Sequence, residues 1–169
     1  MATVTDRHSK SHGGISTPPP VYTATLLTYI ADTYRATYPQ EQARIARAVA
    51  LVDAGHVTLD SSGVATVRSQ HGQAIYHVNG QCDCEDQAAP EGRCKHRFAK
   101  VLARHLACLS HKARYALYLD PLTVEQVPGI AWPSLDGLAI HFAPDEDTYP
   151  TRAWTCAAST LVLLARIEA

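Results

Sequence analysis

The sequence has almost no net charge and no long apolar run. Lysine and arginine number 15 against 16 acidic residues, and the formal net charge is −1 at pH 7. No overall basic excess therefore points to nucleic acid, and electrostatic arguments have to be made region by region. Apolar runs of roughly 18 residues are absent, and the longest candidate, within Thr155–Ile167, is too short and too mixed to span a bilayer. We expect a protein that does not cross a membrane.

Residues 1–20 are polar where an apolar signal core would lie, so we do not expect them to be a secretory leader. We therefore expect the protein in the cytoplasm. The chain has five cysteines, and an odd count without an export signal argues against a disulfide framework. Clustered thiols then indicate metal binding or catalysis.

Motifs of common enzymes are missing as well. The sequence contains no phosphate-binding loop, no Gly-x-Ser-x-Gly elbow, no His-Glu-x-x-His and no deaminase signature. The acidic run Asp145, Glu146 and Asp147 lies between prolines and is typical of a solvated loop. We predict that the protein is not an enzyme and has no small-molecule substrate.

The chain divides into four segments, which together predict one α+β domain. Residues 1–19 are polar and are predicted to be a disordered tail. Residues 20–55 show two apolar stripes of helical period, interrupted at Pro39, and predict an N-terminal helical pair. Residues 56–119 alternate with period two and then return to helical period from Lys95 to about Ala116, which predicts a short antiparallel meander and a long helix. Residues 120–169 are broken by prolines and are expected to form an irregular segment that packs on the same domain.

Between the predicted meander and the long helix lies a cluster of metal-ligand types. Cys82, Cys84, Cys94 and His96 supply the four thiolate and imidazole ligands that one structural zinc ion requires. A Cys-x-Cys pair that ends a strand directs both sulfurs to one side, with Asp83 turned away, and the second pair lies where the helix begins. The alternative is four ordinary residues, but the flanks of Cys82 and Cys84 are polar, which is unusual for buried free thiols. His105 and Cys108 are expected to pack in the core rather than form a second site.

This pattern resembles the SWIM-type zinc finger, whose ligands follow the order Cys-x-Cys, a variable gap, then Cys-x-His. The resemblance covers about residues 64–111 and includes Tyr76-His77-Val78 before the first cysteine and Arg97-Phe98-Ala99 after the histidine. It implies a ββα zinc module of the kind found beside ATPase, transposase and ubiquitin-ligase domains, with proposed roles in binding DNA or other proteins.

Two partner classes remain open. The predicted helix carries basic residues at spacings that place them on one face, opposite its apolar stripe, and this face predicts non-catalytic binding of DNA or another nucleic acid with weak sequence preference. These residues are Arg97, Lys100, Arg104, His111 and Arg114. The alternative is a protein-interaction adaptor that docks through Trp132, Tyr149 and Trp154. Exposed tryptophans and a covered basic face would favour the adaptor, and an open basic face would favour nucleic acid.

Overall fold

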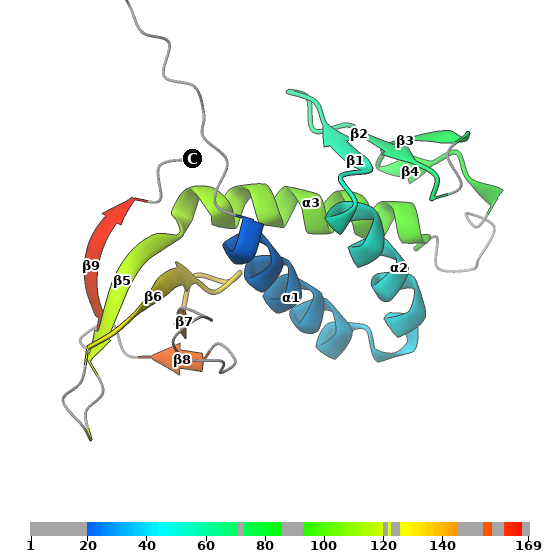
Figure 1. Cartoon of the computed structure of the whole chain (residues 1–169). Coiled ribbons are helices and arrows are strands. Elements are labelled where there is room, and N and C mark those ends of the chain that lie inside the picture. Colours follow the sequence, from blue (N-terminus) through cyan, green and yellow to red (C-terminus); the bar gives the residue numbers. More distant parts are fainter. Residues whose placement is uncertain are drawn as a thin grey trace, which may run out of the picture.

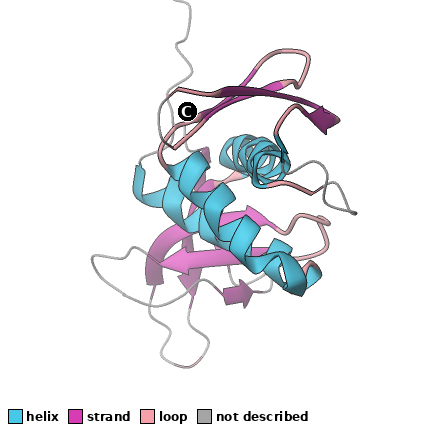
Figure 2. Ribbon diagram, turned by 90° about the vertical axis from the view of Figure 1, so that its right-hand side faces the viewer, coloured by secondary structure: helices cyan, strands magenta, loops and turns pink. Residues whose placement is uncertain are grey.

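The computed structural model describes residues 20–70, 73–85, 93–119, 122, 126–144, 154–156 and 161–166. The predicted disordered tail, the acidic run 145–147 and Tyr149 lie outside the described residues. Within those ranges the fold is α+β, with helices between two antiparallel sheets (Figures 1 and 2). No helix in this part of the chain is long and apolar enough to cross a bilayer.

The predicted N-terminal helical pair is confirmed. Helix α1 spans Pro20–Thr37, a short 3-10 turn η1 spans Pro39–Glu41, and helix α2 spans Gln42–Asp53. Pro39 starts the turn because its ring fixes φ near the helical value and its missing N–H is not needed there. Both helices turn their apolar side chains toward α3, the long helix Lys95–Lys112. Their largest fully buried side chains are Leu26, Ile30, Ile45 and Leu51.

The predicted meander is also confirmed, as a four-stranded antiparallel sheet in the order β1-β2-β3-β4. Alternation decides which side chains face inward, and Ala65, Val67 and Val78 are completely buried on the face that packs against α3. Neighbours on the same strands, such as Arg68 and Asn79, are exposed. The strands are β1 (Val57–Leu59), β2 (Ala65–Arg68), β3 (Ile75–Asn79) and β4 (Gln81–Cys82).

The C-terminal part of the chain differs from the prediction. Residues 120–169 were expected to be irregular, but their described part supplies four strands, β6 to β9, which join β5 of the preceding segment in a five-stranded antiparallel sheet of order β8-β7-β6-β5-β9. The sheet tolerates three prolines, which cannot donate a backbone hydrogen bond. Pro133 and Pro144 are the last residues of their strands. At Pro128, strand β6 pairs only with β5, because its pairing with β7 starts at Gly129. The strands are β5 (Arg114–Leu119), β6 (Gln126–Pro133), β7 (Ile140–Pro144), β8 (Trp154–Cys156) and β9 (Leu161–Arg166).

The long helix ends earlier than predicted. It was expected to reach about Ala116, but α3 stops at Lys112 and Ala113 is already extended, with φ −63° and ψ 148°. Residues from Arg114 onward join β5, which pairs with β6 on one side and β9 on the other. Hydrogen bonds to two neighbouring strands outweigh the weak local preference for helix. Helix α3 therefore follows the first sheet in the chain and leads directly into β5 of the second sheet (Figure 1).

One continuous core joins the helices, the first sheet and one face of the second sheet. Ile130 and Trp132 of β6 belong to the same buried cluster as Leu26 and Leu102. The opposite face of the second sheet holds a smaller cluster around Phe142. Gly129 is required there, because a Cβ at this position would overlap the Phe142 ring and the carbonyl oxygen of Ala143.

Candidate metal centre

The β3–β4 hairpin positions the first two cysteines. Gly80 makes the reversal with φ +73°, a conformation that side chains disfavour, and the register then places Cys82 opposite the buried Val78. Cys84 lies two residues further along and is also buried, while Asp83 between them is exposed. The Oδ1 atom of Asp83 accepts a hydrogen bond of 3.2 Å from the backbone N–H of His77, which holds the Cys-x-Cys segment against β3. The predicted orientation of this pair is present.

The start of α3 positions the other two residues. Cys94 is the N-cap residue, in an extended conformation, and His96 lies in the first turn. Both side chains are buried, at 0% and 2% exposure. Unpaired N–H groups at a helix start carry partial positive charge, which favours a nearby thiolate. The start of the helix therefore places two potential ligands side by side and favours the charged form of a thiolate there.

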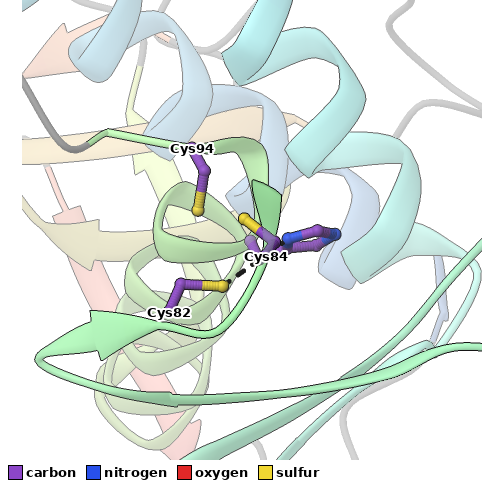
Figure 3. A group of neighbouring side chains, drawn as sticks. Cys82, Cys84 and Cys94 are labelled. Carbon is purple, nitrogen blue, oxygen red and sulfur yellow. Dashed lines mark hydrogen bonds between the residues drawn. The ribbon is translucent and has the colours of Figure 1, made fainter. Parts of the chain in front are cut away.

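The four side chains converge on one point. All four ligand atoms lie within 4.8 Å of one another, and the three sulfurs point toward a common centre (Figure 3). The Sγ atom of Cys82 is 3.7 Å from Nδ1 of His96. A tetrahedral zinc ion with bonds of about 2.3 Å to sulfur and about 2.0 Å to nitrogen separates these two ligand types by about 3.6 Å. The arrangement is compatible with a single metal ion bound by all four predicted residues.

Burial and hydrogen bonding shift the pKa values of two thiols of the cluster in opposite directions. Burial raises the pKa of the Cys82 thiol to about 12. Burial also pushes the pKa of Cys94 upward, but hydrogen bonds with His96 and with the backbone N–H of Arg97 outweigh it and lower that pKa to about 6. Neighbouring thiols with pKa values so far apart do not all ionise unaided. A divalent cation supplies the charge that stabilises three thiolates together.

The imidazole of His96 has an unusual environment. Its ring stacks on the ring of Tyr76 from β3, with centroids 4.1 Å apart and planes inclined by 23°. Its Nε2 atom is buried and has no hydrogen-bond partner among the described residues. Sequence reasoning assigned Tyr76 to a strand but gave it no role at the site. The sequence feature that could have indicated this role is the strand alternation, because Tyr76 lies two residues before Val78 and therefore on the same inward face of the strand.

The predicted basic face is smaller than expected. Arg104 and His111 are exposed on α3, and Arg97 is half-buried. The amine of Lys100 instead donates a 3.1 Å hydrogen bond to the carbonyl oxygen of Val78 and ties α3 to β3. Arg114 is not on the helix: it begins β5, and its guanidinium donates to the carbonyl oxygens of His111 and Ala113 at 3.0 and 2.7 Å. The prediction of five basic residues along one helix face is therefore wrong for Arg114.

The remaining candidate residues lie in different environments. Nε2 of His105 hydrogen-bonds with the hydroxyl of Tyr34 at 3.0 Å, and this half-buried histidine packs as predicted. Cys108 is exposed, so the prediction that it packs in the core is wrong. Trp132 is buried, and the side chain of Trp154 lies outside the described part of the structure.

Comparisons with protein-family models, curated proteins and solved structures return no match to this chain. The interpretation of the metal centre therefore depends on its ligands and their geometry. Among the described residues, Cys82, Cys84, Cys94 and His96 form the one cluster of three or more potential ligands that is compact enough for a metal ion.

Proposed function

We propose that the chain binds one structural zinc ion in a SWIM-type module and acts as a non-catalytic accessory factor that binds nucleic acid. The observation that carries the metal part is the convergence of three thiols and one imidazole, all buried, within 4.8 Å. Soft thiolate ligands with one imidazole in a compact set favour zinc over magnesium or calcium, which prefer oxygen ligands.

A structural role follows from the number of ligands. Catalytic zinc sites keep one position for water or substrate, whereas four protein ligands fill a tetrahedron. The ligands also come from two separate elements, the β3–β4 hairpin and the start of α3. A metal bound here crosslinks strand and helix, so metal binding contributes directly to folding.

The ligand order supports the SWIM-type assignment. Cys82 and Cys84 lie at the end of a hairpin, and Cys94 and His96 lie at the start of the following helix. A β-hairpin followed by a helix is compatible with the ββα arrangement that the resemblance implies, and this supports the proposed assignment.

Nucleic-acid binding is supported by the open part of the basic face. Arg104 and His111 are exposed and form this open part. The half-buried Arg97 lies on the same face two turns before Arg104, and the hydrogen bonds of Arg114 place it at the helix end. Cationic side chains on one helix face neutralise phosphates without reading bases. Because Lys100 is engaged with Val78, we expect few phosphate contacts, modest affinity and little sequence preference.

The burial of Trp132 argues against the adaptor alternative. An adaptor that docks through tryptophan needs that ring at the surface, but Trp132 is 1% exposed and packs edge-on against Tyr29 at 5.7 Å. We therefore favour nucleic acid and retain a protein partner as an outcome of the test.

The test combines metal analysis with a binding titration. Purified protein should contain one zinc per chain, and zinc-loaded protein should bind single- or double-stranded DNA in fluorescence anisotropy at about 50 mM salt and lose most of that affinity by about 200 mM. Replacing Arg97 and Arg104 together by alanine should make the slope of log K against log salt concentration shallower by about 0.9 for each phosphate contact that is lost. Arg47→Ala with Arg68→Ala removes the same charge from exposed positions on α2 and β2 and serves as the control.

Two results would contradict the proposal. Zinc-loaded parent protein that binds neither form of DNA at low salt would exclude the nucleic-acid role and redirect the search to a protein partner. Equal losses in the test and control variants would show that net charge, rather than the α3 face, accounts for binding.

A further inference from the structure

The His96 ring stacks on a tyrosine, and its Nε2 atom, on the side away from the thiols, has no hydrogen-bond partner among the described residues. Metal-binding histidines usually donate their second ring N–H to a carboxylate, a carbonyl or water, and that bond fixes the tautomer and the ring orientation. His96 has no such partner among the described residues, although its Nε2 atom is fully buried. Its described neighbour on the ring face is Tyr76, stacked at 4.1 Å.

The two ring nitrogens of His96 are not equivalent in this structure. Nδ1 faces the thiols and lies 3.7 Å from Sγ of Cys82, close to the separation of about 3.6 Å that a tetrahedral zinc imposes on sulfur and nitrogen ligands. Nε2 lies on the other side of the ring from the thiols and is the nitrogen that has no hydrogen-bond partner among the described residues. Ligation through Nδ1 requires the proton to be on Nε2, in surroundings that exclude water.

We propose that Tyr76 is a positioning residue of the metal centre, whose ring fixes the His96 imidazole so that Nδ1 binds the metal and Nε2 keeps the proton. Stacking here replaces the hydrogen bond that usually orients a ligand histidine. The inference rests on the proposed metal binding and adds to it the identity of the ligand atom and of the group that orients it.

The backbone register explains why Tyr76 can perform this role. Tyr76 and Val78 share the inward face of β3, and Val78 is paired with the ligand Cys82. The carbonyl oxygen of the same Val78 accepts the hydrogen bond from Lys100, which lies one turn after His96 on α3. Strand β3 therefore carries Tyr76 and contacts both the Cys82 strand and the helix that carries His96. These contacts fix the distance between the rings of Tyr76 and His96.

The test uses the full chain, loaded with zinc for NMR and with cobalt(II) for absorption spectroscopy. Long-range proton–nitrogen correlation on zinc-loaded parent protein with labelled histidine should show His96 bound through Nδ1 with Nε2 protonated. Tyr76→Phe keeps the ring and should preserve this pattern, the cobalt spectrum and the metal affinity. Tyr76→Leu removes the ring and should lower metal affinity by about 10- to 100-fold and change the cobalt ligand-field bands.

Tyr118→Leu provides the matched control. Tyr118 stacks on Phe142 at 5.5 Å in the second sheet, so its replacement also removes a stacked tyrosine, but away from the metal ligands. We expect Tyr118→Leu to reduce stability without altering the cobalt spectrum. A cobalt spectrum that changes in Tyr76→Leu but not in Tyr76→Phe or Tyr118→Leu would show that the Tyr76 ring positions the ligand, rather than that the variant is merely less stable.

Three results would overturn the inference. Ligation of the parent protein through Nε2 would contradict the geometry directly, whether or not the variants fold. Parent-like affinity and spectrum in Tyr76→Leu would show that the ring is dispensable. A parent protein that binds neither zinc nor cobalt would overturn the proposed metal function, and the inference with it, and is recognised before any variant is made.

Discussion

The hydroxyl oxygen of Tyr34 lies 3.0 Å from Nε2 of His105, joining α1 to α3 across 71 residues of sequence. Burial raises the pKa of Tyr34, with a further contribution from Tyr38, and burial together with the charge of Arg104 lowers the pKa of His105. Both groups are therefore neutral near pH 7, and one hydrogen bond between them satisfies two half-buried polar atoms.

Protonation of His105 should weaken the fold on acidification. Because its pKa in the folded protein lies below the unfolded value of about 6.5, the unfolded chain takes up the proton first as the pH falls. The stability that neutral His105 contributes is complete above about pH 6.5 and is lost as the pH falls below that value. We predict that zinc-loaded parent protein loses more thermal stability between about pH 7.5 and 5.5 than His105→Gln does. Metal release at low pH is common to both proteins, so equal losses would contradict the prediction.

Replacing one ligand should uncouple strand from helix. Cys94→Ser leaves two buried thiols and one imidazole without a complete ligand set. We predict that the variant loses its bound zinc and becomes sensitive to protease over residues 75–111, because the metal no longer holds the hairpin to α3. Zinc content and limited proteolysis measure this. Cys108→Ser, which changes an exposed cysteine on the same helix, should behave like the parent protein. Parent-like resistance of Cys94→Ser would rule out a structural metal.

Lys100 should contribute to stability rather than to nucleic-acid binding. Its amine donates to the Val78 carbonyl oxygen, so Lys100→Met should lower the free energy of unfolding by about 1 kcal/mol while leaving the salt dependence of DNA binding unchanged. Urea denaturation and anisotropy titrations measure the two effects. Lys112→Met, at an exposed position in the last turn of α3, should cost little stability. A flatter salt dependence in Lys100→Met would return this residue to the phosphate-binding face.

Trp132 should be a core residue and not a docking residue. Its side chain is buried between α1 and the second sheet, with its ring close to those of Tyr29 and His141. We predict that Trp132→Ala lowers the free energy of unfolding by about 3–5 kcal/mol, and that Trp132→Phe costs less because it keeps an aromatic ring in the cavity. A loss below about 1 kcal/mol for the alanine variant in urea denaturation would contradict this placement.

The features that were predictable from the sequence are those with short-range causes. Helical period in residues 20–55, alternation before Gly80 and the ligand set at positions 82–96 are all set by neighbours in the chain. The four ligands could be identified because cysteine is rare and the spacing matches a strand end and a helix start. Their convergence in the structure follows from the same two elements.

The features that were missed depend on partners far away in the sequence. Residues 114–119 are strand because β6 and β9 flank them, and β9 begins more than 40 residues later. The roles of Lys100 and Arg114 follow from carbonyl groups that a helical projection does not show. A basic residue on a helix face has the same sequence signature whether it contacts a phosphate or a backbone oxygen.

The sequence by itself determined the candidate ligand cluster, the helical pair and the meander, because local periodicity and rare residue types specify them. Only the tertiary structure decided that the C-terminal segment is a sheet, that Trp132 is buried, and that Tyr76 stacks on His96. The physical reason is that strand pairing and side-chain burial gain their free energy from contacts between distant segments, which local propensity does not encode.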